Sequence, residues 1–87
     1  MPYTLIYSSQ ALKDLEKLTR AVNRRILAAL ERLAVEDDPG RSVKRLRNSP
    51  LSSLRVGSYR VILDIRREKI TIFVLRAGPR RNVYHDL

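Results

Sequence analysis

Residues 54–65 read L-R-V-G-S-Y-R-V-I-L-D-I, two runs of apolar and β-branched residues separated by Gly57 and Ser58. A two-residue connection with glycine in first place is typical of a type II′ turn, so the stretch predicts a β-hairpin with strands at 54–56 and 59–65. Side chains alternate along a strand, and one face of this hairpin therefore carries the residues expected in the core: Leu54, Val56, Tyr59, Val61, Leu63 and Ile65.

The opposite face of the hairpin carries two arginines. In the register set by the turn, Arg55 lies directly across from Arg60, with Cβ atoms about 5 Å apart, where two like charges repel unless an anion lies between them. The pair therefore predicts a phosphate-binding position. Two alternatives stay open: Asp64 on the same face neutralises the arginines, or an acidic partner protein does so.

The N-terminal residues predict a strand and a short helix. Residues 3–7, Y-T-L-I-Y, are rich in aromatic and β-branched side chains, and the serines that follow at 8 and 9 offer a helix N-cap. The next helix is expected to turn its charged residues, Asp14 among them, toward water. Its three leucines, at positions 12, 15 and 18, lie on the other face.

A second helix is predicted directly after the first. Thr19 offers its N-cap, its apolar stripe runs from Val22 to Ala34, and the sequence D-D-P-G at 37–40 ends it. The charges of this helical hairpin balance, so its expected role is to cover one face of a sheet.

The remaining residues complete the predicted fold. Residues 41–50, R-S-V-K-R-L-R-N-S-P, show no periodicity and are expected to form a basic loop. A strand at 70–75, after a tight turn at 67–68, completes a three-stranded antiparallel meander that Gly78-Pro79 is expected to end. The rest is a short tail or a single helical turn. The prediction is one compact α+β domain over residues 1–87, with an N-terminal strand and a two-helix hairpin packed on the sheet.

Excess basic charge is confined to the second half of the chain. Residues 1–40 hold six Lys/Arg and six Asp/Glu, whereas residues 41–87 hold twelve basic and three acidic residues, which accounts for the net charge of +9. So steep a bias indicates a surface for a large polyanion, with nucleic acid as the expected partner. Ten of the twelve are arginine, whose guanidinium binds two phosphate oxygens at once. A generic basic solubility surface is the alternative, and a membrane surface is disfavoured because the basic residues lie on expected loops and strands.

Composition excludes several other classes of protein. A chain of 87 residues can bury one small core but no separate cofactor domain, and no cofactor is expected. It contains no cysteine and a single histidine, so disulfides and thiolate-bound zinc are excluded and no metal site is predicted. No apolar run is long enough to span a bilayer, and the N-terminus lacks the layout of a signal peptide, so a cytoplasmic protein is expected.

The C-terminal tail gathers side chains suited to RNA cleavage. Arg80, Arg81, Tyr84 and His85 lie within six positions. In such a cleavage the 2′-hydroxyl must lose a proton, the leaving oxygen must gain one, and the phosphorane must be stabilised. The alternative is a tyrosine docked on the core and a solvated histidine.

The chain resembles a known family along nearly its whole length. The strand, helical hairpin, basic loop and meander, together with L-R-V-G-S-Y-R-V-I-L-D-I at 54–65 and A-G-P-R-R-N-V-Y at 77–84, are similar to the RelE toxins of the RelE/ParE superfamily. The resemblance implies a toxin of a type II toxin–antitoxin system, neutralised by a RelB-like antitoxin, that cleaves mRNA in the ribosomal A site without a metal. It also leaves two alternatives, a ParE-like inhibitor of DNA gyrase and a weak toxin that mainly binds its antitoxin.

The resemblance also implies roles for individual residues. Arg60 corresponds to the arginine on the scissile phosphate, Arg80 to a general acid or charge stabiliser, and Tyr84 to the tyrosine that orients the messenger. Supporting phosphate contacts are expected from Arg55 and Arg81.

The chain departs from the family pattern just before the hairpin. Leu51 and Ser53 occupy the positions where RelE toxins carry two lysines, so the role of those lysines has no obvious owner. Three basic residues of the expected loop can reach the same groove: Lys44, Arg45 and Arg47. His85 is a possible base.

Overall fold

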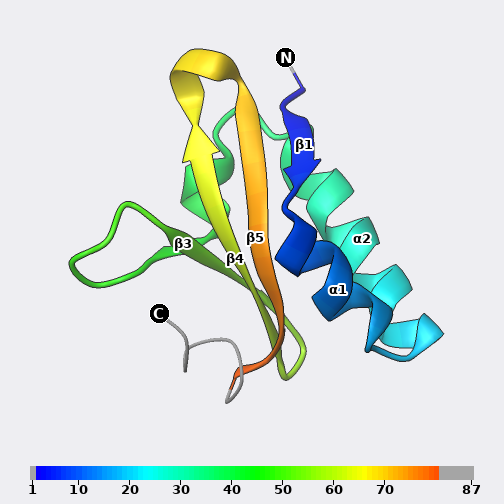
Figure 1. The fold of residues 1–87 in the computed structure, drawn as a ribbon. Coiled ribbons are helices and arrows are strands. Elements are labelled where there is room, and N and C mark those ends of the chain that lie inside the picture. The colour runs from blue at the N-terminus through cyan, green and yellow to red at the C-terminus, as the bar shows by residue number, and fades with distance from the viewer. Residues whose placement is uncertain (1, 81–87) are drawn as a thin grey trace.

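A computed structural model describes residues 2–80 of the chain. Arg81, Tyr84 and His85 lie outside the described residues. Two helices and a mixed five-stranded sheet make up the described part, with the sheet order β1-β5-β4-β3-β2 (Figure 1). The helices are α1 (Ser9–Glu16) and α2 (Arg20–Ala34), and the strands are β1 (Thr4–Tyr7), β2 (Lys44–Arg45), β3 (Ser52–Val56), β4 (Tyr59–Arg66) and β5 (Thr71–Pro79). Short 3₁₀ turns span Pro39–Ser42 and Arg67–Lys69. The α+β prediction is confirmed.

The hairpin register predicted from Gly57 and Ser58 is confirmed. Val56 pairs with Tyr59, and Arg55 pairs with Arg60. Gly57 has a φ of 62°, whereas Ser58 does not have a positive φ, which is the pattern of a type II′ turn. The six residues expected on the core face lie in or against the hydrophobic core.

The core lies between the two helices and one face of the sheet. Both helices and the strands β4 and β5 contribute buried side chains. The start of each helix is fixed by an N-cap. Ser8 Oγ accepts from the Ala11 N–H at 3.0 Å, and Thr19 Oγ1 accepts from the Val22 N–H at 3.3 Å, so both N-cap predictions are confirmed. The buried members from the helices are Ala11, Leu15, Ile26, Leu30, Leu33 and Ala34, and those from β4 and β5 are Val61, Leu63, Ile72, Val74 and Ala77.

The expected basic loop contains a strand that the sequence did not indicate. In β2, Lys44 pairs with Ser53 and Arg45 with Ser52, which also moves the start of β3 from residue 54 to Ser52. A two-residue edge strand made of exposed cations carries no alternation to detect. The meander is therefore part of a larger antiparallel array.

The prediction that Gly78-Pro79 ends the sheet is wrong. β5 continues through Pro79, where Gly78 pairs with Arg60 and Pro79 with Tyr59. Within sheets proline is found where one side of the strand is an edge, and at Pro79 the side of β5 that faces β1 is such an edge, because β1 pairs with β5 only as far as Val74. An irregularity between Ile62 and Leu63 shifts the β4–β5 register and leaves one extra residue on β5.

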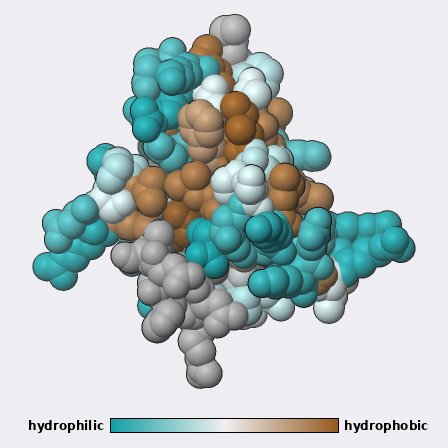
Figure 2. All heavy atoms as spheres, viewed as in Figure 1, coloured by the Kyte–Doolittle hydropathy of each residue, from teal (hydrophilic) through white to brown (hydrophobic). Residues whose placement is uncertain are grey.

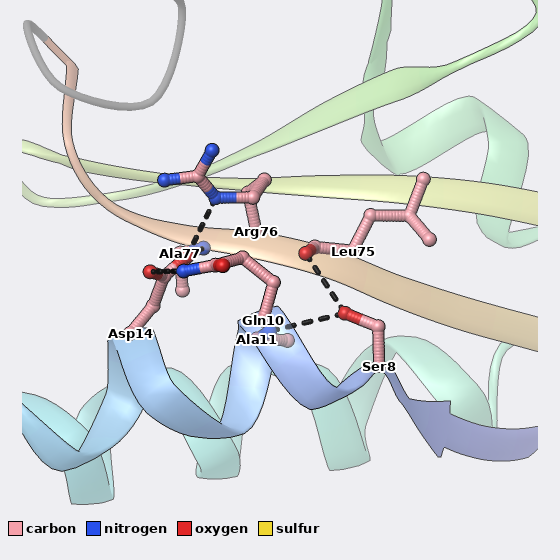
Figure 3. A network of polar contacts seen from close by, with 7 residues as sticks. All are labelled: Ser8, Gln10, Ala11, Asp14, Leu75, Arg76 and Ala77. Atoms are coloured by element: carbon pink, nitrogen blue, oxygen red, sulfur yellow. Dashed lines mark hydrogen bonds and ion pairs between the residues drawn. The ribbon is translucent and has the colours of Figure 1, made fainter. Parts of the chain in front are cut away.

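Asp14 does not face water as the sequence suggested; it is 7% exposed and holds the edge of β5. β1 pairs with β5 only as far as Val74, and α1 takes over beyond that point. Ser8 Oγ donates to the Leu75 carbonyl at 3.0 Å, and Asp14 Oδ2 accepts from the Ala77 N–H at 3.0 Å and from Arg76 Nε at 2.9 Å (Figure 3). The carboxylate thus replaces a strand along this part of the sheet edge.

The ionised form of Asp14 is favoured by these contacts. Burial by itself raises the pKa of the carboxyl, but the hydrogen bonds from Arg76, from the Ala77 N–H and from Gln10 outweigh it and hold the pKa below its ordinary value. Gln10 Nε2 donates to Oδ1 at 2.9 Å. Because the folded-state pKa is depressed, the stabilisation is present above the unfolded-state pKa and is lost as the pH falls through the folded-state pKa.

We expect Asp14→Asn to lower the free energy of unfolding at neutral pH by about 1–3 kcal/mol, because an amide keeps one acceptor but loses the charge. The difference from wild type should shrink below roughly pH 4, where the unfolded-state carboxyl protonates. Urea unfolding at neutral and acid pH measures both effects. Glu16→Gln, at an exposed carboxylate of the same helix, is the control. Equal stability of Asp14→Asn and wild type at neutral pH would contradict the assignment.

Candidate nucleic-acid interface

Cationic side chains surround a groove of about 700 Å³ on the side of the sheet away from the core. Among the described residues none of the lining side chains is acidic, and the wall is completed by two serines and two apolar residues: Ser42, Ser53, Val43 and Leu46. Hydrophilic surface projects over the connection between β2 and β3, at the left of the view (Figure 2). The cations that line the groove are Arg41, Lys44, Arg45, Arg47, Arg55, Arg60 and Arg80.

Arg55 and Arg60 face each other across the β3–β4 ladder, as the hairpin register predicts. Each makes one long hydrogen bond to a nearby carbonyl: Arg55 Nε donates to Gly57 at 3.3 Å, and Arg60 Nη1 donates to Tyr59 at 3.3 Å. Within residues 2–80, most of the N–H groups of both guanidinium forks therefore remain available to a ligand in the groove.

Asp64 is occupied elsewhere. Its Oδ2 accepts from Arg66 Nε at 2.9 Å, and the residue lines a separate cavity of about 480 Å³. Within residues 2–80 no ion pair joins Asp64 to Arg55 or Arg60, so the intramolecular alternative does not neutralise the arginine pair. Neutralisation by an acidic partner remains open.

Strand β2 places residues of the basic loop at 41–50 along the wall of the groove. Lys44 is the cross-strand neighbour of Ser53, one of the two positions where the sequence lacks a lysine, so an amino group is carried to that position from the adjacent strand. Arg45 is fixed by donating from Nε to the Ser49 carbonyl at 3.1 Å. Arg41, in the 3₁₀ turn, also lines the groove. Arg41 was not among the predicted site residues, although it begins the same basic run.

Arg80 reaches the groove because β5 is longer than predicted. The extra pairs between Gly78 and Arg60 and between Pro79 and Tyr59 carry the chain across the end of the hairpin. Arg80 follows directly, is exposed, and lines the same groove as Arg60. The hydrogen bond from the Ala77 N–H to Asp14 braces the strand three residues before Arg80.

This arrangement suits a phosphodiester chain. Fixed guanidinium donors around one groove stabilise charge on phosphate oxygens without reorganisation. Residues 2–80 contain no group of three or more His, Cys, Asp or Glu side chains that could hold a metal ion. None of the helices in this part of the chain is long and apolar enough to cross a membrane.

The chain is similar to several known toxins. Residues 5–84 match the family model described as the ParE toxin of the type II toxin–antitoxin system parDE. Toxin RelG of Mycobacterium tuberculosis is 37% identical over 89 residues, which cover 97% of this chain and 98% of that protein.

Solved structures share the fold. The toxin–antitoxin complex RelBE2 of Mycobacterium tuberculosis contains a chain with a TM-score of 0.70 and 36% identity, covering 92% of this chain and 100% of that one. The archaeal RelE–RelB complex from Pyrococcus horikoshii gives a TM-score of 0.77 at 30% identity, with 94% and 99% covered.

We expect Arg55→Thr to have opposite effects on stability and on RNA binding. Removing one of two opposed like charges, with a good strand former in its place, should raise the free energy of unfolding by about 0.2–1 kcal/mol at low salt. High salt should remove this gain. Affinity for a single-stranded RNA oligonucleotide should fall, and the slope of log K against log salt should decrease by roughly one. Urea unfolding and fluorescence anisotropy measure the two effects. A destabilised variant with unchanged RNA affinity would show that Arg55 is a structural residue.

Proposed function

The chain belongs to the ParE toxin family of type II toxin–antitoxin systems, and we propose that this RelE-like toxin is a ribosome-dependent endoribonuclease that cuts messenger RNA in the A site. The observation that carries the proposal is the groove shared by Arg60 and Arg80, which also holds five further cations and no acidic side chain among the described residues. A groove of this kind fits an RNA backbone bent around a scissile phosphate.

In the proposed reaction, the 2′-oxygen of one nucleotide attacks the adjacent phosphorus, and the bond from phosphorus to the 5′-oxygen breaks. The attacking hydroxyl gives its proton to a base, and the leaving oxygen takes up a proton from solvent water, so the products are a cyclic phosphate and a free 5′-hydroxyl. Arg60 binds the phosphate oxygens throughout. Arg80 stabilises the negative charge of the phosphorane, because a guanidinium does not give up its proton in a protein.

The proton acceptor must be a group with a free lone pair, which neither a guanidinium nor the ammonium group of Lys44 offers. The imidazole of His85 is therefore the candidate base. Lys44, across from Ser53 on the groove wall, supplies positive charge near the phosphate. For Tyr84, which lies outside the described residues, we retain the role of orienting the messenger, and for Arg81 that of a supporting phosphate contact.

A second candidate function is inhibition of DNA gyrase. The observation that favours it is the matching family model, which is described by the ParE toxin. Primer extension on a message translated with and without the purified protein separates the two. Cuts confined to translated frames support the ribonuclease, whereas intact message with accumulating gyrase cleavage complexes supports the inhibitor. A protein that only binds its antitoxin gives neither result.

Arg60→Ala should lower the rate of cleavage of ribosome-bound message on the order of a hundred- to a thousand-fold, because a fixed donor to the phosphorane is lost. Toxicity in cells should disappear with it. Arg60→Lys should restore only part of the rate, since an ammonium group cannot bind two phosphate oxygens in one plane.

Circular dichroism and urea unfolding are the controls for this pair, and both should stay close to wild type, because Arg60 lies on the sheet face away from the core. If a folded Arg60→Ala protein cuts at nearly the wild-type rate, Arg60 is not catalytic, and the role falls to Arg80 and the basic loop at 41–50.

We also propose a cognate RelB-like antitoxin whose toxin-binding part is acidic and covers the basic groove. Relatives of this chain were solved as toxin–antitoxin complexes. Calorimetry should give an affinity that falls as salt rises, because opposite charges meet at the interface. A basic natural partner that contacts only the two helices and leaves the groove open to RNA would contradict this proposal.

A further inference from the structure

A second groove, of about 370 Å³, lies between α2 and the tip of the β3–β4 hairpin. Its helical wall consists of Arg25, Ala28, Ala29 and Arg32. These positions follow the i, i+3, i+4, i+7 pattern of one helix face, so two arginines about 10 Å apart along the axis flank a floor of small side chains. The opposite wall consists of Arg55, Val56 and Gly57.

The turn glycine allows Arg25 to approach the hairpin tip. A Cβ at Gly57 would lie 2.9 Å from Arg25 Nη2, so the guanidinium lies directly against the turn. In the described part of the chain, no acidic side chain lines this groove, and none forms an ion pair with its three arginines. The groove is therefore an electropositive strip, although it lies on a helix from residues 1–40, where basic and acidic residues are equal in number.

Arg55 joins the two grooves. It lines both of them. Because β2 pairs only with Ser52 and Ser53, no strand of the described residues covers the margin of β3 beside Arg55. The first groove lies on the sheet face away from the core, and the second lies on the helix side. Positive potential thus continues around the margin of the sheet from one side to the other.

We propose that this second groove, hereafter the helix-side groove, binds the phosphate backbone of ribosomal RNA and anchors the toxin while the message occupies the first groove. This inference rests on the proposed function. The two grooves lie on opposite sides of the sheet, so the anchoring strand is distinct from the scissile one.

The walls of the helix-side groove favour a phosphate backbone over an acidic peptide. Peptide and protein partners gain most of their affinity from large side chains seated in pockets. This groove offers alanine and glycine surfaces and a single valine between three guanidinium groups, whose planar donors match phosphate oxygens.

The test compares two double variants of α2 that remove the same charge. Arg25→Ala with Arg32→Ala alters the helix-side groove, and Arg20→Ala with Arg24→Ala alters exposed arginines that do not line it. Alanine has the highest helix propensity, so both proteins should fold. Affinity for empty ribosomes is measured over a range of salt concentrations, together with kcat and KM for cleavage of ribosome-bound message and with affinity for the antitoxin.

The groove variant should bind ribosomes on the order of ten-fold more weakly or worse, with a slope of log K against log salt reduced by roughly two, one for each phosphate that an arginine no longer neutralises. KM should rise while kcat stays close to wild type, because the scissile phosphate lies in the other groove. The control variant should change the slope and KM much less.

Four results would overturn the proposal. Equal losses in both double variants would mean that only net charge matters. A groove variant that keeps its ribosome affinity but loses antitoxin affinity would identify a peptide site. If the wild-type protein neither binds ribosomes nor cuts message, both the proposed function and the anchoring role are wrong. If the wild type is fully active and the groove variant is unaffected, only the anchoring role is wrong.

Discussion

The buried carboxylate of Asp14 holds the end of β5 in the sheet, and the position of Arg80 in the basic groove depends on this contact. β1 supports β5 only as far as Val74, and from there the edge of the strand would be open. Asp14 closes it by accepting from the Ala77 N–H and from Arg76, which ties the first helix to the last strand (Figure 3). Burying a carboxylate costs less free energy when several charge-assisted hydrogen bonds reach it than when it has no partner. Because the strand stays in the sheet through Pro79, Arg80 is delivered to the same groove as Arg60.

Local signals predicted most of the fold. Gly57-Ser58 fixes a hairpin register by turn geometry alone, and the N-caps at Ser8 and Thr19 are decided within three residues of sequence. The errors concern partners that are distant in the chain. Asp14 was expected to face water because its partners lie more than sixty positions away. Gly78-Pro79 resembles a strand end, but the start of β4 offers a ladder that prolongs β5. β2 is too short to show any pattern.

The candidate site was predictable to a similar extent. Six of the expected phosphate-binding and catalytic residues lie around one groove, because they share a sequence half whose charge is strongly biased: Lys44, Arg45, Arg47, Arg55, Arg60 and Arg80. Their roles remain predictions, and Arg81, Tyr84 and His85 lie outside the described residues. The helix-side groove was not predictable. Basic and acidic residues cancel along the helical half of the chain when counted in sequence, and only the helical winding separates Arg25 and Arg32 onto one face.

The parallel pairing of β1 with β5 has a consequence for synthesis of the protein. Thr4 pairs with Thr71 and Tyr7 with Val74, so the second residue of each pair is made 67 residues after the first. Contacts at such separation form slowly, because the chain loses loop entropy before the contacts stabilise it. The sheet cannot close on a growing chain until its last strand has left the ribosome. A growing chain therefore lacks its finished basic groove until β5 has emerged, even if both helices and the β3–β4 hairpin have already formed.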